Sequence, residues 1–170
     1  MQANGLFVAA LGAILIAGCS SQFPQTREEY RQLVVSSDSR FKLVDTYVVK
    51  RRFDDVVNSL QRNVPECFDQ NVTTTRRQGG MTTMNQTDEW RNTVEVKDKN
   101  HAEITTQQMM KGAITIKMPP GGYYMGAVDI DRLTPATTKL SFYGTTSSGS
   151  KERWDLIRQW SDGKSTPCPR

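Results

Sequence analysis

The sequence FDDVVNSLQRNVP, residues 53–65, carries the clearest periodic pattern of the chain. Its apolar side chains recur at intervals of three and four residues, which places them on one face of a helix: Phe53, Val56, Val57, Leu60 and Val64. Asp54 and Asp55 stand in the first turn, where negative charge complements the exposed backbone amides. The stretch therefore predicts an amphipathic helix that packs against a core and ends at Pro65.

In the segments before and after this helix, apolar residues tend to recur at every second position, which is typical of strands with one buried face. Val94 and Val96, for example, alternate with charged neighbours. The candidate strands cover residues 42–50, 70–78, 93–99, 103–110, 113–118, 123–132 and 139–144. Turn-forming residues separate most of them, which favours hairpins and an antiparallel sheet. The polar stretch from Gly79 to Thr87 is predicted to be a loop.

Two further helices flank the strand region. Thr26 and Glu29 have the spacing of a capping box, which predicts a short helix over residues 27–35. Near the other end Ser150 can cap a last helix that Gly163 ends. Its residues Trp154, Ile157 and Trp160 share one face, and this predicts a large apolar surface turned toward the core.

These elements together predict an α+β fold. We expect an antiparallel sheet of about five to six strands packed by two helices, in the order strand, helix, strands, helix. This arrangement resembles a helix grip, in which a curved sheet holds a long terminal helix.

The N-terminus has the composition of a secretory signal peptide. Residues 1–18 contain no charged side chain, and an apolar run extends from Leu6 to Ala17. The four residues Ile16-Ala17-Gly18-Cys19 at the end of this segment resemble the lipobox of bacterial lipoproteins. The resemblance implies cleavage before Cys19 and attachment of acyl chains to its thiol, and Ser20 implies release to the outer membrane. The alternative is a buried apolar helix that contains an ordinary buried cysteine.

The domain organisation follows from this interpretation. Residues 1–18 are the predicted signal peptide, residues 19–41 the lipidated cysteine with a tether and a short helix, and residues 42–170 a single α+β periplasmic domain. The order of elements also resembles the periplasmic lipoprotein domains of the outer-membrane barrel-assembly machinery. The shared features are the lipobox at Cys19, the Phe53-Asp54 opening of the first helix and the terminal amphipathic helix.

Cys67 and Cys168 remain when Cys19 is assigned to lipid. An exported chain enters an oxidising compartment, where two such thiols can form a disulfide. The alternative is a pair of free thiols. The chain has no Cys-x-x-Cys sequence, which argues against a redox motif.

The charge pattern does not favour nucleic acid. The chain has 22 Lys and Arg against 18 Asp and Glu, a formal net charge of +4 that is spread along the sequence. Arg51-Arg52 and Arg76-Arg77 are its densest basic sites, and neither is interleaved with the aromatic residues that base stacking needs. We expect a solvated surface and no nucleic-acid partner.

Residues with catalytic or metal-binding chemistry are sparse. His101 is the only histidine, so the common zinc sites cannot be assembled, and we expect it to be an isolated surface residue. There is no Gly-x-Ser-x-Gly sequence for a nucleophile. Asp129 and Asp131 should project from one face of a strand, which polar and apolar alternation explains. We therefore predict no catalytic residue, no metal and no cofactor.

The turn before Tyr123 and Tyr124 is a candidate partner contact, because stiff prolines beside two tyrosines can present an aromatic tip. A plain hairpin turn is the alternative. The sequence thus predicts a non-enzymatic lipoprotein that faces the periplasm, is held in the outer membrane by acyl chains on Cys19, and acts as an accessory or scaffolding subunit of an envelope complex. The alternative function is binding of a small apolar ligand between the sheet and the last helix.

Overall fold

The computed structural model describes residues 23–37, 42–78, 82–111 and 118–169. The predicted signal peptide and Cys19 therefore lie outside the described residues. Along the chain the elements are α1 (Arg27–Ser36), β1 (Lys42–Val49), α2 (Phe53–Phe68), β2 (Gln70–Gln78), β3 (Thr82–Asp98), β4 (His101–Lys111), β5 (Tyr123–Thr134), β6 (Thr137–Thr145) and α3 (Ser148–Ser161). In this part of the chain no helix combines the length and the apolar character needed to cross a bilayer.

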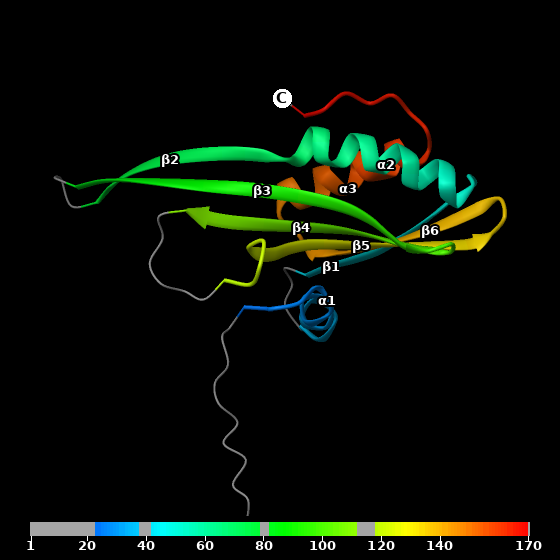
Figure 1. The fold of residues 1–170 in the computed structure, drawn as a ribbon, viewed down its shortest axis with the longest axis horizontal. Coiled ribbons are helices and arrows are strands. Elements are labelled where there is room, and N and C mark those ends of the chain that lie inside the picture. Colours follow the sequence, from blue (N-terminus) through cyan, green and yellow to red (C-terminus); the bar gives the residue numbers. More distant parts are fainter. Residues whose placement is uncertain (1–22, 38–41, 79–81, 112–117, 170) are drawn as a thin grey trace, which may run out of the picture.

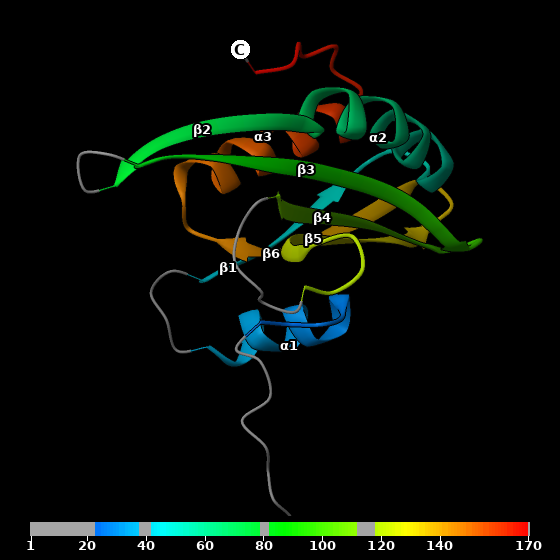
Figure 2. The same ribbon diagram turned by 60° about the vertical axis from the view of Figure 1, so that its left-hand side comes forward.

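Within the described residues, six strands form one antiparallel sheet in the order β1-β6-β5-β4-β3-β2. Strands β2 to β6 follow one another as a meander, and β1 pairs with β6 at the far edge. Figures 1 and 2 show α2 and α3 together on one face of the sheet and α1 on the opposite face. The predicted α+β class and the order strand, helix, strands, helix are confirmed.

The core lies between the sheet and the pair α2 and α3. The five apolar residues of the quoted helix are all 3 % exposed or less. From α3, Trp154 and Trp160 are 2 % and 1 % exposed, and Phe142 of β6 stacks on Trp154 with 4.9 Å between ring centroids. Burial of each such side chain stabilises the fold by about 1.5 to 3 kcal/mol. The predicted core faces of both helices are therefore confirmed.

The space between α3 and the sheet is nearly filled. A cavity of about 20 Å³ remains there, lined among others by Ile104, Phe142 and Ile157. That volume holds about one water molecule.

α2 continues for three residues past Pro65, so the predicted end of this helix was wrong. Proline lacks the N–H that would bond to the carbonyl four residues before it, which costs about 3 kcal/mol inside a helix. The last turn is nevertheless closed by a hydrogen bond from the Asp69 N–H to the Pro65 carbonyl. Phe68 in that turn is 4 % exposed and packs on Trp160, and this burial offsets the cost of the proline.

The loop predicted from Gly79 to Thr87 was wrong from Thr82 onward. β3 begins at Thr82 and pairs with β2 in an unbroken register from Thr82 opposite Gln78 to Trp90 opposite Gln70. Pairing of the backbone holds this arm together, although its residues lack the apolar alternation by which strands are recognised. Residues 79–81 lie outside the described residues.

One smaller prediction lies almost wholly outside the described residues, and another needs correction. The strand predicted over residues 113–118 is outside the described residues except for Met118, which is not in a strand. The cap of α3 is Ser147, whose side chain accepts a hydrogen bond from the Ser150 N–H, rather than Ser150 itself. A serine three residues earlier has the same capping chemistry, so the sequence alone did not separate the two.

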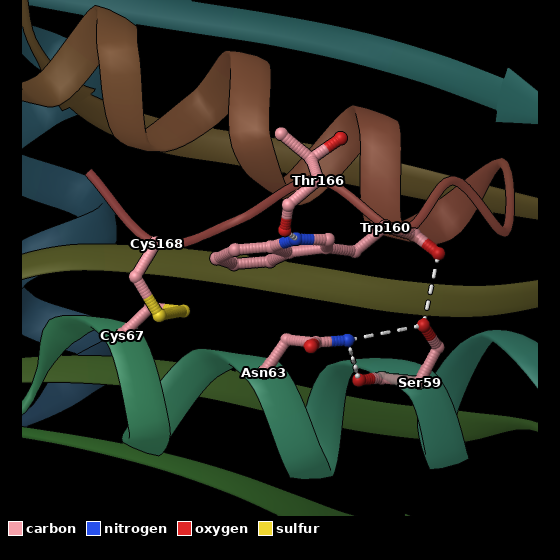
Figure 3. The surroundings of a disulfide bond; sticks show 6 residues. All are labelled: Ser59, Asn63, Cys67, Trp160, Thr166 and Cys168. Carbon is pink, nitrogen blue, oxygen red and sulfur yellow. Dashed lines mark hydrogen bonds between the residues drawn. A yellow bond between two sulfur atoms is a disulfide. The ribbon is translucent and has the colours of Figure 1, made fainter.

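After α3 the chain turns back along α2. Gly163, with φ of +83°, ends the helix as predicted, because a side chain is rarely tolerated at this backbone conformation. The indole N–H of Trp160 donates to the Thr166 carbonyl at 2.9 Å, and Ser59 of α2 donates to the Trp160 carbonyl at 3.0 Å. Figure 3 shows how these bonds hold the C-terminal tail beside α2, where Cys67 and Cys168 form a disulfide bond.

Candidate functional site on the α1 face of the sheet

Charged and aromatic side chains gather on the side of the sheet that α1 covers. We call this side the α1 face, and it consists of α1 together with the side chains that β1, β4, β5 and β6 turn toward it. Those that matter most here are His101, Glu103, Asp129, Asp131 and Tyr143.

An ion-pair cluster attaches α1 to β5 and β4. Arg27 and Arg31 stand four residues apart and so share one side of the helix. Both reach Asp129, at 2.7 Å for Arg27 Nη2 and 2.8 Å for Arg31 Nη2. Arg27 Nη1 also lies 3.1 Å from Glu103 Oε1. Asp129 is only 5 % exposed, and the two guanidinium groups offset the cost of burying its carboxylate.

Apolar contact between α1 and the sheet is limited. Tyr30 and Val34 are buried against Ala127 of β5. The Tyr30 hydroxyl donates to the Met125 carbonyl at 2.8 Å, and burial raises the pKa of this phenol to about 12. The phenol therefore keeps its proton at neutral pH and maintains this hydrogen bond.

His101 is not the isolated surface residue that the sequence predicted. Its Nδ1 lies 2.8 Å from Asp131 Oδ1, and its Nε2 lies 3.4 Å from Glu103 Oε1. Burial lowers the pKa of His101, but the hydrogen bonds to the two carboxylates outweigh burial and raise it above its ordinary value. Strand pairing produces this contact, because His101 of β4 stands opposite Asp131 of β5.

This contact gives a pH-dependent contribution to stability. Because the pKa of His101 is raised in the folded state, the contribution should be fully present below about pH 6.5, the ordinary histidine pKa, and be lost as the pH rises through the folded pKa. Its size should be at most about 1 kcal/mol, since the side chain is 30 % exposed.

An NMR titration measures this directly, because the chain has a single histidine. We expect a folded-state pKa above the ordinary value, and Asp131→Asn should move it down. A pKa at or below the ordinary value in the wild-type protein would contradict the assignment.

The same cluster contains atoms of the kind that bind metal ions. His101, Glu103 and Asp129 each place one such atom within 4.8 Å of the others. Arg27 already donates to both carboxylates, so a cation there would have to displace the guanidinium that holds α1. We therefore assign these residues to ion pairing.

The two tyrosines of the candidate partner contact do not form an exposed tip. The turn before them is closed by a hydrogen bond from the Gly122 N–H to the Pro119 carbonyl. Tyr123 is 6 % exposed and packs on Phe23 with 4.6 Å between ring centroids, while Tyr124 packs against the apolar contact under α1. Contact of either tyrosine with a partner remains a prediction, and it would require Phe23 or α1 to move.

The sequence reasoning missed the role of Arg27 and Arg31. A signal was present, because both arginines share the buried side of α1 with Tyr30 and Val34, at positions i, i+3, i+4 and i+7. Arginines on the inward side of a helix require an acidic partner beneath them. The sequence could not say which carboxylate it is.

Comparisons with known proteins provide no family. No protein-family model matches the chain, and no curated protein is similar to it. Among solved structures, a hypothetical protein of Helicobacter pylori has a TM-score of 0.43 and 9 % identity, covering 78 % of this chain and 92 % of that one. A Chromobacterium violaceum protein has a TM-score of 0.37 and 7 % identity, and the match covers 75 % of this chain and 99 % of that one. A Mycobacterium smegmatis protein has a TM-score of 0.36 and 10 % identity, and the match covers 76 % of this chain and 93 % of that one. We draw nothing about function from similarities of this size.

Proposed function

We propose that this chain is a lipid-anchored lipoprotein of the outer membrane that faces the periplasm and serves, without enzymatic activity, as an accessory or scaffolding subunit of a cell-envelope complex. The observation that carries the proposal is the lipobox-like sequence ending at Cys19, which stands close before a folded domain. The disulfide between Cys67 and Cys168 supports it, because such bonds persist in oxidising compartments such as the periplasm.

The contacts of the charged residues on the α1 face are consistent with a structural role. Asp129 and Glu103 are engaged by Arg27, and His101 is engaged by Asp131. These groups pair with one another and fix α1 to the sheet. A domain that is held rigid close to its anchor is suited to present a surface to neighbouring proteins.

Replacement of Cys19 by alanine should abolish lipidation, because only a thiol at this position can form the thioether to the diacylglyceryl group. We expect the variant to lose incorporation of labelled palmitate and to accumulate as an uncleaved or soluble form. Ser21→Ala is the matched control and should be labelled like the wild-type protein. Labelling of Cys19→Ala at the wild-type level would exclude the lipobox.

The accessory role is tested by affinity purification from detergent-solubilised membranes. The wild-type protein should recover the same envelope protein in repeated preparations, and Cys19→Ala should recover less of it because the variant is not anchored by acyl chains in the outer membrane. Failure to recover any partner under several detergents would count against this role while leaving the lipid anchor in place.

The alternative function, binding of a small apolar ligand between the sheet and α3, has no favourable observation. Ligand sites have volumes of about 300 to 1,000 Å³. The cavity in this position is about 20 Å³.

A further inference from the structure

The first described residue of the chain lies on the same side of the sheet as α1. Phe23 packs on Tyr123, and α1 begins four residues later, at Arg27. The disulfide, the C-terminal tail, α2 and α3 all belong to the other side (Figures 1 and 2). The chain therefore enters the domain on the α1 face.

The length of chain before Phe23 limits how this domain can sit on a membrane. Cys19 and Phe23 are four residues apart, and a fully extended chain of this length spans about 14 Å. Seen from the side on which the chain enters, the outer surfaces of α2 and α3 lie behind α1 and the sheet. Two layers of helix alone are about 20 Å thick, which exceeds the reach of about 14 Å of this chain segment. A bilayer that holds acyl chains on Cys19 can reach the α1 face and cannot reach the α2 and α3 surfaces.

Part of the exposed apolar surface lies on the α1 face, while Val96 of β3 is exposed on the opposite face, beside Phe53 and Val57 of α2. Among the described residues, none of the large apolar side chains that are exposed belongs to α2 or α3. Phe23, Leu33 and Val35 are 42 %, 50 % and 54 % exposed and lie on α1 or just before it. Val44 and Val48 of β1 are also exposed, and Val44 stands beside Tyr143 of the α1 face in the sheet register.

Two grooves along α1 combine these apolar groups with polar ones. One groove of about 180 Å³ lies between Leu33 and Lys42, and another of about 390 Å³ lies between Val35 and Tyr143. Tyrosines and lysines beside small apolar surfaces suit the layer of lipid head groups, where one part of each side chain is apolar and the other is hydrated. The exposed Glu29 and Gln32 on the outer side of α1 are too polar for the hydrocarbon layer.

We propose that the α1 face rests on the phospholipid head groups, with Phe23, Leu33 and Val35 in the interfacial layer and with α2 and α3 turned toward the periplasm. This inference rests on the proposed lipid anchor at Cys19. The ion-pair cluster at Asp129 fixes α1 to the sheet, so the orientation of α1 sets the orientation of the whole domain.

The test uses the full-length lipidated protein in vesicles of phosphatidylethanolamine and phosphatidylglycerol. Val35→Cys on the α1 face and Arg62→Cys on α2 replace exposed residues, and each new thiol is labelled with a fluorophore under conditions that keep the native disulfide intact. A quencher attached to the lipid head group should reduce the fluorescence of the label at position 35 several-fold more than that of the label at position 62.

The outcomes separate this inference from the proposed function. Protein that stays with the vesicles but shows equal quenching at both positions, or stronger quenching at position 62, overturns the orientation and leaves the anchor standing. Quenching at neither position overturns it as well, because the α1 face then does not rest on the lipid head groups. Protein that does not float with the vesicles overturns both the anchor and the orientation.

Discussion

Replacement of both Cys67 and Cys168 by serine should lower the free energy of unfolding by about 4 to 5 kcal/mol. The two residues are 101 positions apart, so the bond closes a loop that contains β2 to β6 and α3. Loop-closure entropy of the unfolded chain gives about 4.7 kcal/mol for a loop of about 100 residues. Urea unfolding of the wild-type and double-serine proteins, each purified from the oxidising compartment, measures the difference.

The structure adds a local effect to this prediction. Without the bond, the tail that places the Thr166 carbonyl on the Trp160 indole is tied down only by its own hydrogen bonds (Figure 3). The tryptophan fluorescence, to which Trp160 contributes together with Trp90 and Trp154, should therefore shift toward that of a hydrated indole in the double-serine protein. Reduction of the wild-type protein is the matched control and should reproduce the loss of stability. A loss below about 1 kcal/mol would show that the unfolded chain is already compact.

Replacement of Asp129 by alanine should cost about 3 to 5 kcal/mol, the range measured when one partner of a buried ion pair is removed. Asp129 accepts hydrogen-bonded contacts from Arg27 and Arg31, and the substitution leaves both guanidinium groups on the α1 face without this carboxylate. We expect α1 to separate from the sheet before the domain unfolds. Urea unfolding and hydrogen exchange of the α1 amides measure the two effects.

A matched control separates the cluster from a general effect of charge removal. Asp55 is an exposed aspartate in the first turn of α2, where its charge contributes about 0.3 to 1 kcal/mol through the helix dipole. Asp55→Ala should therefore be destabilising by no more than that amount and should not change exchange in α1. Equal losses for Asp55→Ala and Asp129→Ala would show that the cluster does not hold α1.

The loss of α1 docking also bears on the membrane orientation. An Asp129→Ala protein that keeps its acyl chains should remain on vesicles, because the anchor precedes α1. Its domain should be free to tumble, so the difference in quenching between positions 35 and 62 should shrink. The proposed anchor and the proposed orientation thus depend on different residues and can be tested separately.

Much of the fold was predictable because it follows from local patterns. The stripe from Phe53 to Val64 and the face with Trp154 and Trp160 are read from residues a few positions apart, and both lie in the core. The end of α2 was mispredicted for the same reason, since Pro65 is a local helix breaker. Phe68 keeps the last turn helical through contact with Trp160, which is far away in the sequence.

The candidate site was much less predictable than the fold. His101 has no neighbour in the sequence that indicates a site. Its contact with Asp131 exists because β4 and β5 pair in one particular register. The strand over β2 was predicted, but the first part of β3, from Thr82 to Thr87, was predicted to be a loop, because its pairing with β2 comes from backbone groups, which polar residues provide as well as apolar ones.

Local residue patterns were enough to predict the α+β class, the apolar faces of α2 and α3 and an anchor at Cys19, because each depends on residue types within one short segment. The folded arrangement was needed to learn that α1 lies on the sheet face opposite α2 and α3, and that Arg27 contacts Asp129 across 102 positions of sequence. The physical reason is that charges attract whichever opposite charge the fold brings near, and that proximity is set by strand order and register.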